Sequence, residues 1–340
     1  MSLPDLYLIG TVLVVAICAS LMARLLPPRS PTPPRHGALQ GFRGLLAFGV
    51  FMHHSFIWSH YAHGQGWLDS EGFRQFGESR VVLFFMLTAT LFYGRLLDAR
   101  GRNLDWLKLY VSRVLRLSPA YAFSMVLMFA VIAWATVHQI DGAGTSIVKF
   151  TWSDIVGTAT TWLAFCMLGM PSIDAYMATP AVTAGVTWTM PYEVTFYLLL
   201  PLLALPLRVR MPATTLGLGL AAAIWTMLWP STPEYCVPFA GGLAVAMLVR
   251  LPRVVAVLRR RFFAVPAMAA MISAIVFFPT VYAPVPLLLL FFSMAVFACD
   301  NDLFGILRWR APQALGQWAY SLYLLHGIAL YTLFLSLIHI

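Results

Sequence analysis

Residues 117–138 read Leu117-Ser-Pro-Ala-Tyr-Ala-Phe-Ser-Met-Val-Leu-Met-Phe-Ala-Val-Ile-Ala-Trp-Ala-Thr-Val-His138, with no lysine, arginine, aspartate or glutamate. An apolar stretch of about 17–25 residues is what a helix needs to cross the hydrocarbon core of a bilayer. Because the core offers no water to hydrogen-bond the backbone, a spanning segment of this kind forms a helix. This stretch therefore predicts a transmembrane helix.

The composition of the whole chain extends this prediction. Of the 340 residues, 60% are hydrophobic and only 10% are charged, and the mean hydropathy is +0.80. Soluble domains carry about 25% charged residues, so a soluble globular enzyme, a disordered tail and a fibrous repeat are excluded. The sequence predicts an all-α fold, a polytopic bundle of about 10–11 membrane helices. The other predicted spans lie near residues 6–26, 42–60, 81–97, 152–170, 187–207, 212–229, 235–249, 262–279, 284–299 and 318–338.

The chain divides into three predicted parts. Residues 1–26 are expected to form an extra N-terminal transmembrane helix, because no basic residue precedes Arg24 as a signal peptide would require. Residues 27–39 form a Pro-rich basic linker, and residues 40–340 form the membrane domain. The connections between apolar blocks are short, so any chemistry is expected within the bundle or at its edges.

The net charge of +9 comes mostly from arginines just outside the apolar blocks. This pattern is typical of a protein oriented by the positive-inside rule, and it predicts the lipid bilayer as a partner. A nucleic-acid partner is not predicted, because no clustered basic, aromatic-rich surface is visible. A crossing at 152–170 would place Arg208 and Arg210 outside. Either this segment is re-entrant, or the rule is broken there. The basic loops are residues 24–35, 95–116, 208–210, 250–261 and 308–310.

Arg43 and His54 lie within one apolar stretch. An ionisable side chain inside a span costs about 2.5–3.5 kcal/mol on insertion scales and is a functional hypothesis by default. At about 100° per residue the two side chains share a helix face, roughly 16 Å apart along the axis, whereas His53 points about 80° away. Histidine can accept a hydroxyl proton near neutral pH, so we expect His54 to be the working group. An interfacial anchor is an equally good interpretation of Arg43.

Two further segments carry charged side chains within or beside apolar stretches. Arg113 and Arg116 face the same side of a helix and present forked donors suited to phosphate, although ordinary positive-inside bias also explains such a pair. Glu193 lies about one turn inside an apolar span, near Trp188 and Tyr192, which fit an interfacial belt. If Glu193 has a functional role, its carboxylate is expected to contact a histidine, an arginine or a ligand hydroxyl. If its role is only structural, the carboxylate is expected to pair with an arginine of a neighbouring helix.

No metal site is predicted. His53 and His60 share a helix face, but no cysteine or carboxylate completes a ligand set. The cysteines show neither zinc-ligand spacing nor a disulfide framework; they are Cys18, Cys166, Cys236 and Cys299.

Taken in order, several segments resemble the membrane acyltransferase-3 family, whose members transfer acyl groups to sugar hydroxyls. The resemblance runs from about residue 40 to the end of the chain. The family pattern is not kept at Thr88-Ala-Thr90 and Thr189-Met-Pro191, which leaves the acceptor preference unassigned. The matching segments are Phe42-Arg43-Gly44 through His54, Val82 through Leu87, Arg113 through Tyr121, Trp188 through Pro201, and Ala319 through His326.

The resemblance implies a multi-pass O-acyltransferase of the bacterial inner membrane. It would move an acyl group, acetyl by default, from the co-substrate acyl-CoA to a hydroxyl of a cell-envelope glycan, glycolipid or glycoside, with no bound cofactor. It implies catalytic roles for Arg43, His54 and Glu193. It implies donor binding by Arg113, Arg116 and Tyr121. It implies acceptor or supporting roles for His53, Trp188, Tyr192, Tyr197, Tyr323 and His326.

Two other functions stay open. A proton-coupled transporter would also use buried histidine, glutamate and arginine side chains, although no inverted repeat is visible. A non-catalytic membrane scaffold would tolerate replacement of Arg43, His54 and Glu193 together. The oligomeric state is not predicted.

Overall fold

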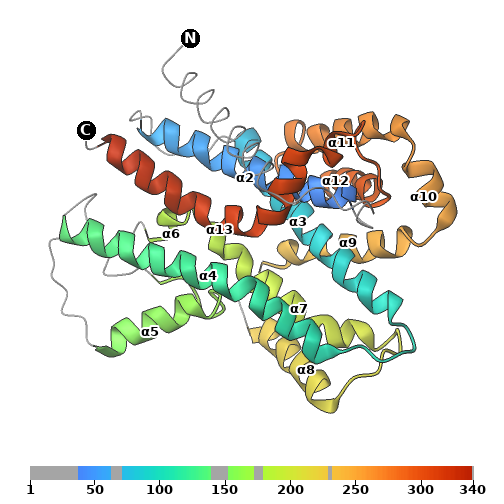
Figure 1. The fold of residues 1–340 in the computed structure, drawn as a ribbon, viewed down its shortest axis with the longest axis horizontal. Helices are drawn as coiled ribbons and strands as arrows, with labels where there is room; N and C mark the ends of the chain where they lie inside the picture. Colours follow the sequence, from blue (N-terminus) through green and yellow to red (C-terminus); the bar gives the residue numbers. More distant parts are fainter. Residues whose placement is uncertain (1–36, 63–70, 139–151, 172–178, 229–231, 339–340) are drawn as a thin grey trace, which may run out of the picture.

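A computed structural model describes residues 37–62, 71–138, 152–171, 179–228 and 232–338 (Figure 1). Regular structure in these ranges is helical apart from one bridge between Asn103 and Arg210. The predicted extra helix at 1–26 lies outside the described residues. The helices are α2 Gly37–Ala62, α3 Glu71–Asp98, α4 Trp106–Val137, α5 Trp152–Leu163, α6 Thr179–Val182, α7 Met190–Ala204, α8 Ala213–Leu228, α9 Val237–Leu248, α10 Pro252–Leu258, α11 Ala264–Val276, α12 Pro284–Ala298 and α13 Arg310–Ile338, with 3-10 turns η1 Val186–Thr189, η2 Pro233–Cys236, η3 Arg261–Phe263 and η4 Ile306–Arg308.

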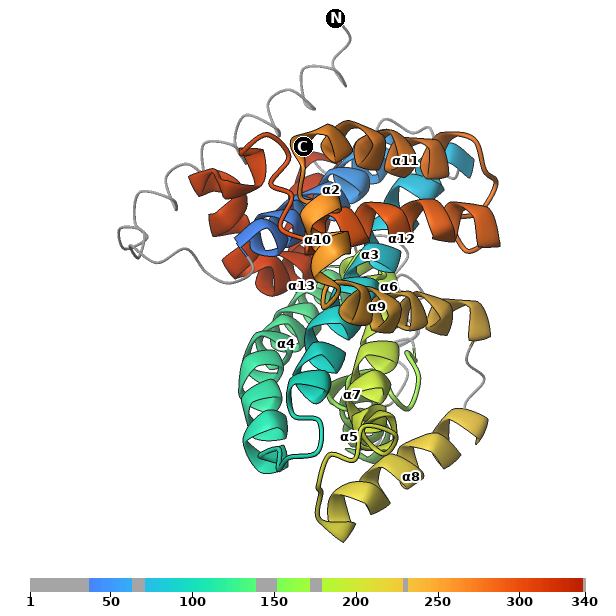
Figure 2. The same cartoon turned by 90° about the vertical axis from the view of Figure 1, so that its right-hand side faces the viewer.

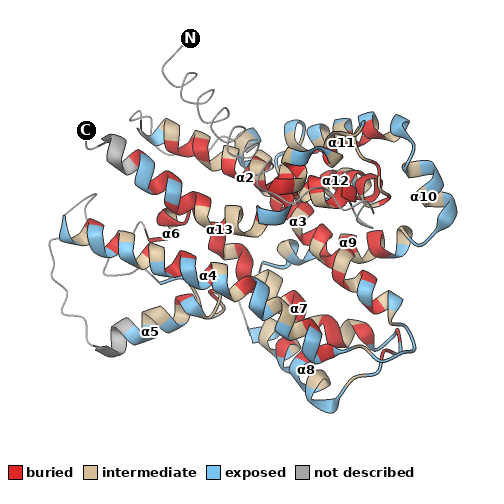
Figure 3. Ribbon diagram, viewed as in Figure 1, coloured by how far each residue is buried: buried red, intermediate tan, exposed pale blue. Residues whose placement is uncertain are grey.

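The all-helical prediction is confirmed for the described ranges, but the predicted number of spans is not. Among the described helices, Gly72–Asp98 and Trp106–Val137 are long and apolar enough to cross a membrane. A third span is added if Pro233–Leu248 and Pro252–Leu258, bent by 105°, count as one. Exposed apolar side chains on the outer faces of α4 and α8 suit contact with lipid (Figure 3). They include Phe123, Val126, Leu220, Ile224 and Met227.

Glycines bring α2 and α13 into backbone contact. A Cβ added to Gly44 would lie 2.3 Å from the carbonyl oxygen of Pro312, and one added to Gly316 would lie 2.0 Å from that of Gln40. Small residues permit such close approach between membrane helices, whose packing depends on van der Waals contact. These glycines therefore fix how the side chains of α2 meet α13.

The same two helices run in the same direction. At their beginnings, Gln313 Nε2 donates to the carbonyl of Gly37 over 2.7 Å. Toward their ends, the rings of Trp58 and Phe334 lie 6.4 Å apart. Figure 1 shows the two helices side by side, and Figure 2 shows α11 and α12 on one side of α3 and α9, with α4, α7 and α8 on the other.

Three basic loops gather at one end of the bundle. Arg250 forms an ion pair with Asp98 at 2.6 Å, and the backbone N–H of Arg210 donates to the carbonyl of Arg102 over 3.1 Å. Helix α4 starts at this end, and α7 finishes there. Val137 therefore lies at the opposite end of the bundle, whereas Met190, where α7 begins, belongs to the same buried cluster as Tyr121.

The segment at 152–170 does not cross the bundle as one span. Helix α5 has 12 residues, about 18 Å at 1.5 Å per residue, against a hydrocarbon core of about 30 Å. Near the middle of α4, the Tyr121 hydroxyl donates to the carbonyl of Trp162 over 2.6 Å, and Trp162 Nε1 donates to the carbonyl of Pro171 over 3.0 Å. Helix α5 therefore ends beside the middle of α4. This position favours the re-entrant alternative, under which Arg208 and Arg210 stay with the other basic loops.

Helix α4 begins earlier than the apolar pattern predicts. Its first residue is Trp106, because the Asp105 carboxylate accepts a hydrogen bond of 2.8 Å from the backbone N–H of Lys108 and caps the helix. Arg113 and Arg116 therefore lie on the helix itself rather than in a loop leading to it.

Candidate active site

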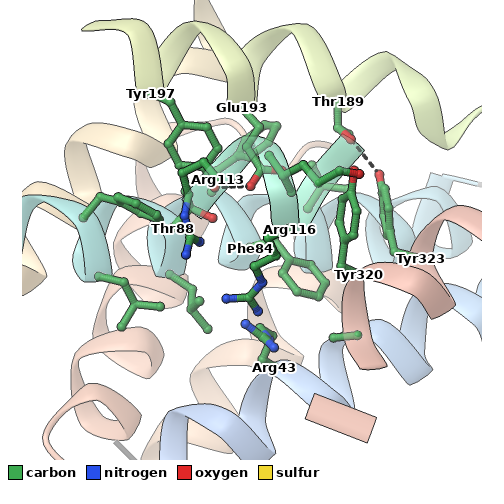
Figure 4. A pocket seen from close by; sticks show the side chains of 17 residues that line it. Arg43, Phe84, Thr88, Arg113, Arg116, Thr189, Glu193, Tyr197, Tyr320 and Tyr323 are labelled. Atoms are coloured by element: carbon green, nitrogen blue, oxygen red, sulfur yellow. Dashed lines mark hydrogen bonds between the residues drawn. The ribbon is translucent and has the colours of Figure 1, made fainter. Parts of the chain in front are cut away.

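A cavity of about 110 Å³ opens where α2, α3, α4, α7 and α13 meet (Figure 4). Its wall is apolar on the α3 side, with Phe84 and Leu87. The polar groups come from the other four helices, from η1 and from one residue of α3. They are Arg43, Thr88, Arg113, Arg116, Thr189, Glu193, Tyr197, Tyr320 and Tyr323.

Arg43 is held against the backbone of α13. Its Nε donates to the carbonyl of Gly316 over 3.0 Å, and its Nη2 donates to the same oxygen. Figure 4 shows the guanidinium at the foot of the cavity, facing Arg116. The side chain thus lines a cavity instead of serving only as an interfacial anchor.

Arg113 and Arg116 project into the cavity from one face of α4, one turn apart. The Arg113 guanidinium lies 5.0 Å above the centre of the Phe92 ring, and its Nε is buried without a hydrogen-bond partner. Buried donors in folded proteins are normally satisfied. This unsatisfied N–H is therefore available to an acceptor brought by a ligand.

Glu193 is paired with a tyrosine rather than with an arginine. The Tyr197 hydroxyl, one turn further along α7, donates to Glu193 Oε1 over 2.5 Å. Among the described residues, no ion pair joins Glu193 to Arg43, Arg113 or Arg116. The structural pairing considered for a non-functional Glu193 is therefore not observed. Three guanidinium groups facing one carboxylate leave the cavity with excess positive charge.

A second, wider space of about 420 Å³ adjoins this cavity. Both are lined by Arg43 and Arg116, and the wider one is also lined by Gln40 and Gln317 at the beginnings of α2 and α13. Together they lead from the end of the bundle that carries the basic loops to the three arginines of the cavity.

His54 forms a pair with His326 of α13. His54 Nδ1 lies 3.0 Å from His326 Nε2. Arg43 and His54 therefore both meet α13, as their shared helix face predicts. His54 is not among the residues that line either of these spaces, however, so the two side chains do not share one cavity.

Tyr323 separates the cavity from the histidine pair. Its ring lines the cavity, and the centre of this ring lies 6.2 Å from that of His326. The Tyr323 hydroxyl lies 2.9 Å from Thr189 Oγ1 and 3.0 Å from the carbonyl oxygen of Val186 (Figure 4). The histidines thus stand directly behind the inner wall of the cavity.

The side chains of His53 and Tyr121 point away from the cavity. The His53 ring stacks on Phe73 at 4.6 Å and packs over Gly77 of α3, where an added Cβ would lie 2.6 Å from its Nε2. Tyr121 is buried between α4 and α5, with its hydroxyl bound to Trp162. It does not line the cavity, so the structure gives it no contact with a donor there.

Trp188 and Tyr192 belong to an aromatic cluster at the start of α7. Their ring centres lie 4.8 Å and 5.5 Å, respectively, from that of Tyr235 in η2. The cluster extends to Tyr282, which lies 4.9 Å from Tyr235. It stands at the end of α7 that is remote from the basic loops.

The comparison with known families agrees with this arrangement. A model of the acyltransferase 3 family, described as an acyltransferase domain, matches residues 36–340. The chain belongs to this family. It is a membrane acyltransferase, and nothing in the match favours a transporter. No curated protein and no solved structure matches the chain.

The sequence pattern did not indicate one half-buried cation of this acyltransferase, Arg80. The Arg80 guanidinium lies 3.3 Å above the centre of the Phe76 ring, and its Nη1 donates to Ser79 Oγ over 2.9 Å. It packs against α2 at Gly49, where an added Cβ would lie 2.8 Å from Arg80 Nε. The apolar run predicts a span from residue 81, whereas α3 begins at Glu71. Arg80 therefore lies well inside the helix rather than at its border.

The two segments of the acyltransferase that depart from the family pattern both reach the cavity. Thr88 supplies part of its α3 wall, and Thr189 supplies the hydroxyl beside Tyr323. Both segments therefore contribute to the surface of the cavity.

Proposed function

We propose that this acyltransferase takes an acyl group, acetyl by default, from acyl-CoA and transfers it to a hydroxyl of a cell-envelope glycan or glycoside. The observation that carries the proposal is the cavity in which three arginines face one carboxylate without forming an ion pair. Coenzyme A is a polyanion, and arginine forks bind phosphate oxygens in a bidentate manner.

The connected spaces suggest how the donor lies. The wider space begins at the end of the bundle with the basic loops, which the positive-inside rule assigns to the cytoplasm. Phosphates bound by Arg116 and Arg113 would leave the thioester arm pointing toward Tyr323 and the histidine pair. The unsatisfied Nε of Arg113 supplies a donor for a phosphate oxygen.

Arg43 could stabilise negative charge at the thioester carbonyl or hold a donor phosphate, and the distance along α2 supports the second role. Eleven residues separate it from His54, or roughly 16 Å of helix. A guanidinium that far from the base does not touch the carbonyl under attack. We therefore assign Arg43 to the donor phosphates, anchored by its hydrogen bonds to Gly316.

His54 would act as the general base. It takes the proton from the acceptor hydroxyl as the hydroxyl oxygen attacks the thioester carbon. The bond between carbon and sulfur then breaks, and the leaving thiolate takes up the proton from His54. If His54 instead carried the acyl group itself, the kinetics would be ping-pong.

The aromatic cluster suggests the direction from which the acceptor arrives. Trp188, Tyr192 and Tyr235 lie at the end of α7 opposite the basic loops, and His54 also lies in the half of α2 away from Arg43. Flat aromatic rings with polar edges suit the apolar faces and hydroxyls of sugars. Donor and acceptor would then approach His54 from opposite sides of the membrane.

The test compares surface glycans from cells with the protein, without it, and with His54→Ala. Mass spectrometry should show a gain of one acyl unit that requires both the protein and His54, because general-base catalysis contributes about 100-fold or more. Transfer of label from radioactive acetyl-CoA by purified protein in nanodiscs would identify the donor. A folded His54→Ala protein that acylates at the normal rate would overturn the assignment. Solute flux through liposomes without acyl-CoA would favour the transporter.

A further inference from the structure

We infer that His326 is a positioning residue that holds His54 in the tautomer whose Nε2 carries no proton. The inference deepens the proposed function, on which it rests, because it explains how His54 presents a lone pair to the acceptor hydroxyl. It follows from the hydrogen-bond partners of two rings on adjacent helices.

The proton on His326 is assigned by its neighbour on α13. His326 Nδ1 lies 3.0 Å from the carbonyl oxygen of Leu322, one turn earlier. A carbonyl oxygen only accepts, so Nδ1 must be the protonated nitrogen of the ring. In a neutral imidazole the other nitrogen is then an acceptor. His326 Nε2 therefore presents a lone pair toward α2.

The same reasoning then fixes His54. Its Nδ1 faces two acceptors, the carbonyl oxygen of Val50 at 3.1 Å and His326 Nε2 at 3.0 Å. Nδ1 must carry the proton that both acceptors share, which leaves Nε2 of His54 as the bare, basic nitrogen. No described residue forms a hydrogen bond to that nitrogen. It remains available to the acceptor hydroxyl.

The surroundings of His326 keep this geometry rigid. The side chain is buried, and the Phe51 ring stands edge-on to it at 6.4 Å. At the next residue, a Cβ on Gly327 would lie 2.2 Å from the backbone carbonyl carbon of Thr183, so α13 lies directly on the turn that follows α6 there. The ring thus has little room to turn away from His54.

The histidine pair also accounts for where the proton goes during acyl transfer. When His54 Nε2 takes the hydroxyl proton, its ring becomes a cation whose Nδ1–H still donates to His326 Nε2. The new ester bond forms, the thioester bond breaks, and the proton on Nε2 passes to the departing sulfur. His326 plays the part of the carboxylate in a catalytic triad, orienting the base and stabilising its charged form, but as a neutral ring.

Two substitutions of similar volume test the inference. In His326→Gln, the side-chain oxygen reaches the place of Nε2 and accepts from His54, whereas His326→Leu offers no acceptor. We expect kcat to fall on the order of 100-fold in His326→Leu and to recover most of that loss in His326→Gln. The KM for acyl-CoA should stay the same in both, because neither variant touches the arginine cavity. Equal kcat in wild type and His326→Leu would overturn the inference.

A readout without turnover separates this inference from the proposed function. The protein contains eight histidines. Nitrogen-15 NMR of histidine-labelled protein in nanodiscs, assigned with His54→Gln, reports which nitrogen is protonated. We expect His54 to carry its proton on Nδ1 in wild type and to lose part of this preference in His326→Leu, where the carbonyl oxygen of Val50 at 3.1 Å is the one acceptor that the described residues leave to Nδ1. A wild-type His54 protonated on Nε2 refutes the inference whatever the activity. A wild type that transfers no acyl group refutes the proposed function alone.

Discussion

Arg113 and Arg116 differ from the other basic residues of their loop in what surrounds them. Arg100 and Arg102 are exposed at the end of the bundle and line neither the cavity nor the wider space beside it, whereas the half-buried Arg113 and the partly exposed Arg116 line the cavity. The sequence alone does not separate these residues, because all of them satisfy the positive-inside rule. The distinction arises because the Asp105 cap starts the helix early enough to direct the later pair toward Glu193.

Replacing Arg113 or Arg116 by glutamine should therefore weaken donor binding. Hydrogen bonds to charged groups contribute about 1.5–3 kcal/mol each, which corresponds to a rise in the KM for acyl-CoA of roughly 10- to 100-fold per variant. The matched control is Arg100→Gln, which removes an equal charge from the exposed part of the loop. Steady-state kinetics at fixed ionic strength make the comparison. Equal KM values in the three variants would mean that the cavity does not bind the phosphates.

Several residues of the site were recognisable from the sequence, and others depended on helix packing. Because helical geometry gives the direction of a side chain, Arg43 and His54 both meet α13 and His53 points to α3. The contact between His54 and His326 joins the two ends of the matched region, so no spacing within the sequence predicts it. Tyr121 illustrates the converse case, since its motif resembles a donor site while its hydroxyl is used inside the bundle.

At the scale of helices, the contact between α2 and α13 holds both functional groups in register. Arg43 reaches Gly316 near the start of the contact, and His54 reaches His326 about three turns later. A change in the separation of these helices would therefore disturb the donor anchor and the histidine pair together.

The substitution Gly316→Ala would increase the separation of α2 and α13. Its Cβ would lie 2.0 Å from the carbonyl oxygen of Gln40, so the two backbones must separate. We expect a loss of stability of about 1–3 kcal/mol, a lower thermal midpoint in detergent, and a fall in kcat at the same time.

Gly217→Ala in α8 is the matched control, because a Cβ there meets no atom within 4 Å. Helix propensity favours alanine over glycine by about 1 kcal/mol, so this variant should be as stable as wild type or more so. If both alanine variants unfold at the wild-type temperature, close packing between α2 and α13 does not determine the geometry of the site.

At the scale of the whole molecule, the positive-inside rule and the path of the chain agree once segment 152–170 is re-entrant. The apolar length of that segment alone predicts a crossing. The structure has a short helix there that ends at Leu163, and the hydrogen bond from the Tyr121 hydroxyl to the carbonyl of Trp162 holds its end against the middle of α4. The parallel course of α2 and α13 is consistent with this path. If every other predicted block from 42–60 to 318–338 crosses, their number is odd, and the first and last must point the same way.

Labelling of single cysteines from either side of sealed membranes tests this topology. In a background in which Cys18, Cys166, Cys236 and Cys299 are replaced by serine, Arg100→Cys and Arg208→Cys should react only from the cytoplasmic side, and His138→Cys only from the opposite side. A crossing at 152–170 would instead expose Arg208→Cys on the side of His138→Cys, because it adds one passage through the bilayer between the two basic loops. That result would also separate Arg210 from Arg102, whose backbone contact closes the basic end of the bundle. It would move the end of α7 to the outer surface and remove the common entrance through which acyl-CoA is proposed to reach the arginines.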